Sequence, residues 1–332
     1  MLATKTYVAS DPDEYVSLIR GGRVEVIVSQ RGVFDASVTR VDLGDLWMQR
    51  ARESLPRTFR AALAADRATL CFLASPQPAI TVLSSPMEYS DMALLAPGEA
   101  LCTRSVAPCE WGVMSLPTEE FRRYRVILTG KEVLPHEIPQ VLRPLRHRLS
   151  RLRRLHHATV DLAETAPKAL SHPEAARGLQ QHLIEAAFGA VTDANDQVSV
   201  RGHHRQRIMA RFEALIEANP DRAHFLTEVC EAIGVTERTF RNCCQRDLGM
   251  SPARYLSLRR LHQAHWALRV ADGANTTVTE VATRYGFWHL GRFSVAYREV
   301  FHESPSETLR RRSGRPFSPQ NRGVALTFSE SG

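Results

Sequence analysis

The chain has 332 residues, of which 43% are hydrophobic and 24% are charged, and its formal net charge is +7. This length allows two or three domains with ordinary cores, and the composition is typical of soluble globular proteins. The positive charge favours an acidic partner, nucleic acid before an anionic membrane. The absence of a signal-peptide pattern or of roughly 18 consecutive apolar residues predicts a cytoplasmic protein with no membrane partner.

Short β-strands are predicted over residues 23–116. The first strand shows alternating apolar residues, which are Val24, Val26 and Val28. Compact apolar runs at 68–74 and 79–83 are bounded by turn residues and indicate further strands. Many short strands at close spacing favour an antiparallel β-sandwich or barrel.

The β-rich region is not expected to hold a metal or another cofactor. It contains no histidine, whereas a barrel-type metal centre needs clustered histidines and a glutamate. Holding a small apolar or amphipathic effector is the more natural function of such a barrel. Candidate lining residues are Phe34, Trp47, Phe59, Phe72 and Trp111. A plain core position is the commoner role for large aromatic residues, so the effector-binding residues stay unassigned.

The six cysteines show no CxxC pair and no regular framework. This pattern is typical of reduced, mostly buried thiols in a reducing compartment. A redox sensor that uses Cys102 and Cys109 is a less favoured alternative.

The pattern changes to a helical period after the β-rich region. A helix is predicted over residues 139–157, where leucines recur at 3-4-3 spacing and arginines cover the remainder. The leucines are Leu142, Leu145, Leu149 and Leu152. Two interpretations stay open, because the stripe can pack on the β-rich domain or form a short dimerisation seam.

A second helix is predicted over residues 173–190, and the apolar pattern is lost after it. Residues 191–204 are therefore predicted to be a linker between domains. Two histidine pairs lie in this part of the chain, His156-His157 and His203-His204. They have no acidic or thiol companions at ligand spacing, so surface positions are predicted for all four.

One apolar pattern occurs twice between Phe225 and Glu307. The first half of the pattern recurs 52 residues later and the second half 53 residues later. The first copy contains Leu226, Val229, Cys230, Gly234, Val235, Phe240, Cys244, Leu248, Ser251 and Pro252. The second contains Val278, Val281, Ala282, Gly286, Phe287, Phe293, Tyr297, Phe301, Ser304 and Pro305. Each copy is predicted to be a helix-turn-helix unit, whose second helix can enter the major groove of DNA.

The outward face of each second helix separates a DNA reader from a purely structural hairpin. A step of about 100° per residue turns Arg238, Arg241, Asn242 and Gln245 outward in the first copy. Arginine can bind guanine edges, and asparagine or glutamine can bind adenine edges. In the second copy the outward set includes Gly291, Arg292 and Val295. The first copy is therefore predicted to supply more of the base readout.

Phosphate contacts are predicted for polar residues beside these faces. These residues are Thr236, Thr239, His289, Ser294 and Arg298. A single helix from Pro252 to about Ala271 is predicted between the copies. Its length of about 30 Å is close to the ~34 Å between successive major-groove faces, so one chain could place both units on one side of a duplex.

These residues resemble the AraC/XylS family of bacterial transcriptional regulators over about the last third of the chain. The motifs that carry the resemblance are Leu226-x-x-Val229-Cys230-x3-Gly234-Val235, Leu248-Gly-Met-Ser-Pro252-x-x-Tyr255, Arg260-Leu261-x-x-Ala264 and Val281-Ala282-x3-Gly286-Phe287-x5-Phe293-Ser294-x-x-Tyr297-x3-Phe301-x-x-Ser304-Pro305. The resemblance implies an all-helical domain that binds two successive major-groove segments and activates transcription through RNA polymerase. The family's base-contacting positions fall on Arg238, Arg241, Asn242, Leu290, Gly291, Arg292 and Val295. Two departures are Cys230 in place of the usual alanine and His302 in place of a common glycine.

The predicted fold class is α+β, with an antiparallel β-rich domain followed by an all-α domain. The effector-binding and dimerisation domain is predicted over residues 1–190, the DNA-binding domain over 205–316, and a flexible tail over 317–332. The leading hypothesis is a dimeric, effector-responsive transcription activator that binds double-stranded promoter DNA and RNA polymerase. It is not expected to be an enzyme, since the sequence offers no identifiable nucleophile-base pair, carboxylate pair or metal set. An enzyme tethered to DNA and a non-specific architectural DNA binder stay open as alternatives.

Overall fold

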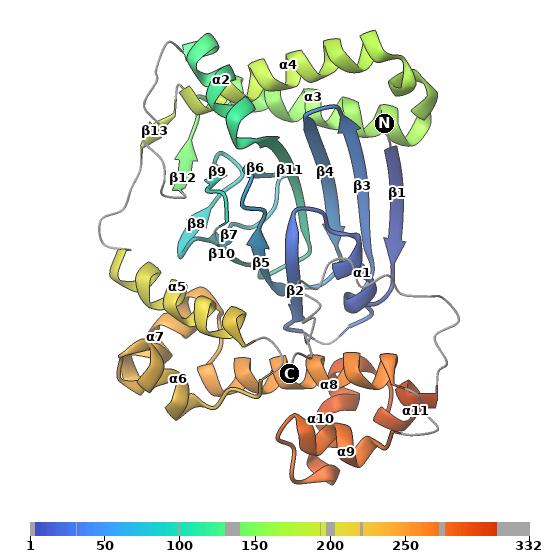
Figure 1. Ribbon diagram of the computed structural model, residues 1–332, viewed down its shortest axis with the longest axis vertical. Coiled ribbons are helices and arrows are strands. Elements are labelled where there is room, and N and C mark those ends of the chain that lie inside the picture. Colours follow the sequence, from blue (N-terminus) through green and yellow to red (C-terminus); the bar gives the residue numbers. More distant parts are fainter. Residues whose placement is uncertain are drawn as a thin grey trace, which may run out of the picture.

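The chain folds into an antiparallel β-rich part followed by an all-helical part, as the sequence predicts (Figure 1). This computed structural model describes residues 4–30, 32–98, 100–129, 140–192, 194–196, 203–219, 222–271 and 276–310. The strands are β1 (Thr4–Ala9), β2 (Gly22–Val28), β3 (Ala36–Leu43), β4 (Leu46–Glu53), β5 (Arg57–Leu63), β6 (Arg67–Leu73), β7 (Ile80–Val82), β8 (Ser85–Met87), β9 (Met92–Leu95), β10 (Ala100–Arg104), β11 (Cys109–Pro117), β12 (Gln140–Arg143) and β13 (Asn195–Asp196). The helices are α1 (Pro12–Leu18), α2 (Thr118–Thr129), α3 (Arg146–Thr165), the 3-10 helix η1 (Pro167–Ser171), α4 (Pro173–Thr192), α5 (His203–Ala218), α6 (Leu226–Ile233), α7 (Glu237–Asp247), α8 (Pro252–Val270), α9 (Val278–Arg284), α10 (Leu290–Phe301) and α11 (Pro305–Arg310). Among the described residues, no helix combines the length and the apolar content that crossing a bilayer requires.

The strands form two antiparallel sheets that share a core. The larger sheet has the order β1-β3-β4-β11-β6-β9-β12-β13, and the smaller has the order β2-β5-β10-β7-β8. In β6, Cys71 and Leu73 pack in the core that includes residues of the smaller sheet, whereas Leu70 and Phe72 pack on the opposite side, against helices. This alternation follows the two-residue period of a strand, and it confirms the predicted antiparallel β-rich domain.

Helices α2, α3 and α4 cover the outer face of the larger sheet (Figure 1). The helix predicted over 173–190 is α4, which extends to Thr192. The helix predicted over 139–157 was misplaced, because residues 140–143 form strand β12 and α3 runs from Arg146 to Thr165. The physical reason is Pro144, which disfavours helical backbone in the preceding residue, while pairing of β12 with β9 supplies the strand with hydrogen bonds.

The predicted leucine stripe packs inside the protomer. Leu142, Leu149 and Leu152 are buried in the core between the larger sheet and its helices, and Leu145 is exposed just before α3. Three of the four leucines therefore take part in packing on the β-rich domain, the first of the two interpretations.

The same stripe continues to His156, which is buried against the larger sheet. Its ring packs edge-on against Phe72, with the ring centroids 5.1 Å apart. Burial, together with the nearby Arg50 guanidinium, lowers the pKa of His156 to about 3. The surface position predicted for this histidine is wrong, because the 3-4 spacing of α3 extends one turn beyond Leu152.

The helical part has two cores, one for each copy of the repeat. Helices α5, α6, α7 and the first turns of α8 enclose the first core, and the rest of α8 with α9 and α10 encloses the second. Helix α8 joins the two units and is buried along most of its length (Figure 1). It is the single connecting helix that the sequence predicts.

The β-rich and helical parts are in contact. Ile27 of β2 belongs to the same core as Phe212, Phe240 and Tyr255 of the first unit. Figure 1 shows α8 lying below β2. Helices α4 and α5 extend into the two ends of the predicted linker, residues 191–204. Residues 193 and 197–202 of this linker lie outside the described residues, as does the predicted tail.

Candidate nucleic-acid interface

Helices α6 and α7 form the first helix-turn-helix unit. Gly234 ends α6 with a left-handed φ of 69°, and its N–H donates to the carbonyls of Cys230 and Glu231. A β-carbon at this position would meet no atom within 4 Å, so backbone conformation alone favours glycine. The Thr236 hydroxyl then caps α7 by accepting the N–H of Thr239 at 3.3 Å. These local features set the direction in which α7 leaves the turn.

The side of α7 opposite its core is exposed and rich in hydrogen-bonding groups. All four residues predicted to contact bases from this helix are exposed, and they are Arg238, Arg241, Asn242 and Gln245. The Arg241 guanidinium is ion-paired with Glu237 one turn earlier, and the Gln245 amide donates to the Gly249 carbonyl at 3.3 Å. The outward orientation agrees with the sequence analysis, while contact with DNA stays a prediction.

The second unit begins with the predicted capping box on α9. The Thr277 hydroxyl accepts the Glu280 N–H at 3.2 Å, and the Glu280 carboxylate accepts the Thr277 N–H at 2.8 Å. The hydrogen bonds that Thr277 donates lower the pKa of Glu280. Gly286, with a φ of 77°, follows α9, and α10 then buries Phe293 and Tyr297. The second unit therefore repeats the first in its local construction.

The exposed face of α10 differs chemically from that of α7. Its predicted base-contacting residues are all exposed, and they are Leu290, Gly291, Arg292 and Val295. Only Arg292 among them carries a side-chain donor. The indole of Trp288, just before α10, is 75% exposed. This face therefore offers apolar surface where α7 offers polar groups.

The residues predicted to contact phosphate lie at the margins of these two faces. Thr236, His289 and Arg298 are exposed, and Thr239 and Ser294 are half-buried. Helix α10 ends at His302, which adopts a left-handed φ of 58° and donates its N–H to the Arg298 carbonyl at 3.0 Å. The helix end therefore keeps the geometry that glycine usually provides, at a steric cost of about 1 kcal/mol.

A largely apolar cavity lies between the two sheets. It encloses about 580 Å³ of space not filled by atoms, part of which is open to solvent. Three of the aromatic residues singled out from the sequence line it, namely Trp47, Phe59 and Trp111. Phe72 instead packs on the helix-covered side of the larger sheet, and Phe34 lies in the inter-sheet core outside the lining.

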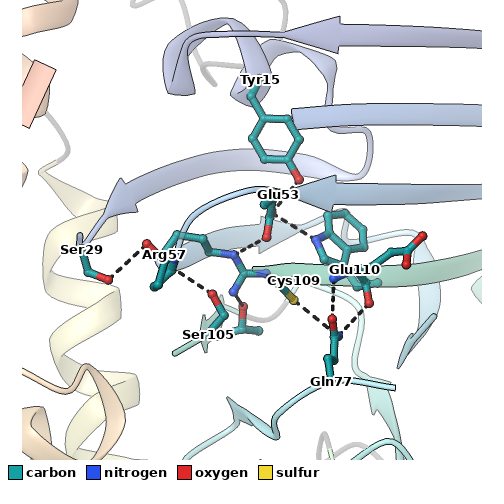
Figure 2. A network of polar contacts seen from close by, with 11 residues as sticks. Tyr15, Ser29, Glu53, Arg57, Gln77, Ser105, Cys109 and Glu110 are labelled. Carbon is teal, nitrogen blue, oxygen red and sulfur yellow. Dashed lines mark hydrogen bonds and ion pairs between the residues drawn. The ribbon is translucent and has the colours of Figure 1, made fainter. Parts of the chain in front are cut away.

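A buried ionic network borders this cavity (Figure 2). The Glu53 carboxylate accepts hydrogen bonds from the Tyr15 hydroxyl at 2.6 Å, the Trp111 indole N–H at 3.1 Å and the Arg57 Nε–H at 2.9 Å. Arg57 also donates to the Thr103 hydroxyl at 2.8 Å. Burial lowers the pKa of Arg57, but the Glu53 charge outweighs it and holds that pKa above its usual value. The guanidinium at the cavity therefore already has its counter-ion.

The two cysteines of the redox alternative do not have the character of reactive thiols. Burial raises the pKa of Cys109 to about 12, and burial with the nearby Glu213 carboxylate raises that of Cys102 well above its usual value. Both are free thiols in the structure. Since the thiolate is the reactive form, the structure gives this alternative no support.

Charged residues line the contact between the β-rich and helical parts. The Glu25 carboxylate is 3.2 Å from Arg60 Nη1 and 3.1 Å from Arg259 Nε, and both arginines are buried. Arg60 also donates to the Glu213 backbone carbonyl at 3.2 Å.

A second polar contact joins Ser84 of the β-rich part to the end of α7, where the Asp247 carboxylate accepts the Ser84 hydroxyl at 2.6 Å. The sequence indicates neither contact, because an isolated polar residue on a strand or loop gives no sign of a distant partner.

Comparison with known proteins finds similarity to the helical part of the chain. Residues 229–311 match a family profile described as a helix-turn-helix domain. The probable thc operon regulatory protein of Rhodococcus erythropolis is 39% identical over 95 residues, which cover 29% of this chain and 29% of that protein. The XylDLEGF operon transcriptional activator of Pseudomonas putida is 35% identical over 100 residues, which cover 30% of this chain and 31% of that protein. The chain thus spans less than a third of the length of these two curated relatives.

One solved structure is similar to part of this chain. It is that of a probable AraC family transcriptional regulator from Rhodopseudomonas palustris CGA009. Its sequence is 39% identical, and the match covers 31% of this chain and 95% of that chain with a TM-score of 0.28.

Proposed function

We propose that this protein is a sequence-specific transcription regulator whose C-terminal region is a helix-turn-helix domain of the AraC/XylS family. In this proposal α7 and α10 enter two successive major-groove segments of one duplex. The observation that carries it is the exposed face of α7, where Arg238, Arg241 and Asn242 present base-reading donors opposite a buried apolar face.

The test compares Arg241→Ala with Arg177→Ala on two DNA substrates. One is an operator selected from a random duplex library by the parent protein, and the other is random DNA. Arg177 is a matched control, because it is exposed on α4 in the β-rich part and ion-paired one turn away with Glu174, as Arg241 is with Glu237.

A base-reading arginine contributes about 1–3 kcal/mol of discrimination, so Arg241→Ala should lose about 5- to 150-fold in operator affinity. Its affinity for random DNA should fall far less, and Arg177→Ala should change neither. Equal losses of Arg241→Ala on both substrates would support the architectural, non-specific alternative instead.

The cavity between the sheets supports a role in binding an effector. Its walls are mainly apolar, and the Arg57 charge beside it is neutralised by Glu53. A small apolar or neutral amphipathic molecule therefore fits it better than an anion, because an anion would have to compete with a fully buried carboxylate.

Binding of the apolar dye Nile red to the full chain tests this proposal. Ala61 lines the cavity on β5 and is buried, so Ala61→Phe should fill the space and abolish saturable binding. A variant that folds normally and binds the dye unchanged would place the dye elsewhere and refute the assignment.

The regulator is proposed to act as a homodimer in the cytoplasm, where it can meet the chromosome. Because Leu142, Leu149 and Leu152 are packed in the protomer's own core, Leu145 is the exposed member of the predicted seam. Light scattering on the full chain at micromolar concentration tests the dimer, and a monomeric mass refutes it. A dimeric mass that Leu145→Glu leaves unchanged excludes Leu145 from the interface.

Activation through RNA polymerase is proposed because one relative is named as an operon activator. Transcription in vitro from a promoter that carries the selected operator tests this directly. Increased transcript in the presence of the protein supports activation, and decreased transcript supports repression. Binding rather than catalysis is proposed as the whole activity of the chain.

A further inference from the structure

Three metal-ligating side chains meet where the β-rich part contacts α8. Asp11, Asp13 and His265 each offer one ligand atom, and these atoms lie within 4.8 Å of one another. Asp11 and Asp13 lie at the start of α1, whereas His265 is on α8, so the cluster joins segments far apart in the sequence. One imidazole nitrogen with two carboxylate oxygens suits Zn²⁺ and similar transition metals, whereas Mg²⁺ and Ca²⁺ prefer oxygen alone.

The His265 imidazole is buried, and its Nε2 lies between the two carboxylates. The residue is 3% exposed, and Nε2 is 3.6 Å from Asp11 Oδ2 and 3.6 Å from Asp13 Oδ2. Within the part of the chain that the structure describes, this nitrogen has no hydrogen-bond partner. Tetrahedral ligands about 2.1 Å from Zn²⁺ are about 3.4 Å apart, so the observed spacing fits a shared metal ion.

The rest of the His265 ring is held in the tautomer that a metal ligand needs. Nδ1 is 2.7 Å from the Tyr297 hydroxyl, and Tyr297 donates its proton to the Thr308 hydroxyl at 2.8 Å. Tyr297 can therefore only accept from His265, which places a proton on Nδ1 and leaves the lone pair of the neutral ring on Nε2. Thr308 in turn donates to Glu303 at 2.6 Å, and outer contacts of this kind orient metal ligands.

The Asp11 carboxylate is oriented in a similar way. Its Oδ1 accepts the N–H groups of Asp13 at 2.8 Å and of Glu14 at 3.2 Å, and it is also ion-paired with Arg269. These contacts hold Oδ1 away from the cluster and turn Oδ2 toward His265. The ligand atoms are thus positioned by the helix cap and by the core of the second unit.

We propose that Asp11, Asp13 and His265 form a binding site for a divalent transition-metal ion of the Zn²⁺ class, with a water molecule as the fourth ligand. Two carboxylates neutralise the charge of the ion. Because the ligands come from α1 and α8, the bound ion ties the β-rich part to the helix that joins both DNA-binding units. The site exists independently of whether the chain regulates transcription.

Equilibrium binding of Zn²⁺ to the full chain tests the proposal. The protein is stripped of metal with EDTA and kept reduced, and binding is measured by competition with a chromophoric zinc indicator. We expect one Zn²⁺ per chain, with affinity weakened more than about tenfold in Asp13→Asn and in His265→Gln. The control His182→Gln changes an exposed histidine on α4 and should bind as the parent does.

Two features keep the test decisive. Asp13→Asn changes a side chain that is 14% exposed and preserves its shape, so it serves if His265→Gln does not fold. Co²⁺ should give the visible absorption of a tetrahedral site in the parent and not in either variant. Unchanged Zn²⁺ affinity in both variants would assign the ion to other residues, such as the cysteines, and overturn the proposal. Failure of the parent to bind Zn²⁺ saturably would overturn it as well.

Discussion

Replacement of Glu53 by glutamine tests how the buried ionic network holds the two sheets together. The carboxylate is fully buried and accepts from Tyr15, Trp111 and Arg57, whose side chain is 2% exposed. A glutamine amide offers one oxygen and one donor to these three donors, so the Arg57 cation loses its counter-charge. Removing one partner of a buried pair costs about 3–5 kcal/mol. We expect a loss of about this size in the free energy of unfolding, measured by urea denaturation followed by far-UV circular dichroism.

The matched control is Glu119→Gln, which breaks an ion pair with Arg122 on the surface of α2. Glu119 is 81% exposed, and such pairs contribute about 0–1 kcal/mol. The double variant Glu53→Gln with Arg57→Met removes the stranded cation, so it should be more stable than the sum of the single changes predicts. A loss below about 1 kcal/mol for Glu53→Gln, or additive losses in the double variant, would refute the reasoning.

Three further predictions concern single side chains. Stability should fall as the pH is lowered from about 6.5 toward 3, because the unfolded chain protonates His156 near its usual pKa of about 6.5, whereas burial lowers its folded pKa to about 3. This group can change the free energy of unfolding by at most about 1.4 kcal/mol per pH unit. Urea titrations at several pH values should show that the free energy of unfolding of His156→Gln depends less steeply on pH. His302→Gly should raise the melting temperature, because it removes a β-carbon from a residue with left-handed backbone conformation at the end of α10. The expected gain in the free energy of unfolding is up to about 1 kcal/mol. A lower melting temperature would contradict this prediction. Glu25→Gln removes the carboxylate shared by Arg60 and Arg259 and should lower the free energy of unfolding by about 2 kcal/mol. The loss is smaller than for a fully buried pair because Glu25 is 24% exposed and partly screened by solvent. An unchanged urea midpoint would show that this contact contributes little.

Local patterns in the sequence were sufficient to predict the helix-turn-helix units. Gly234, Thr236 and the capping box at Thr277 act through neighbours within a few residues, so their spacing identifies the turns and helix starts directly. The apolar pair Phe240 and Cys244 likewise fixes which side of α7 faces the core. The exposure of the candidate base-reading residues follows from that geometry.

Features that depend on distant parts of the chain could not be predicted in this way. Glu25 occupies a polar position in the alternating pattern of strand β2, which says nothing of its partner. Its contact with Arg259 forms only when the chain folds. The cluster at His265 requires two residues from the start of α1 and one residue of α8, in the last third of the chain. The predicted start of α3 is wrong for a local reason. The leucine pattern runs through both β12 and α3, and Pro144 prevents the helix from starting before it.

The burial of α8 has a consequence for the DNA sequences that the protein can occupy. Its 19 residues span about 28 Å, and a tilt of about 10° would displace one end by about 5 Å, more than the rise of one base pair of about 3.4 Å. Because the helix is packed between two cores and the β-rich part, such a tilt would disrupt several layers of side chains at once. In the proposed mode of DNA binding, α8 therefore fixes the spacing of the two units, and an operator with a single base pair inserted between its two half-sites should bind much more weakly.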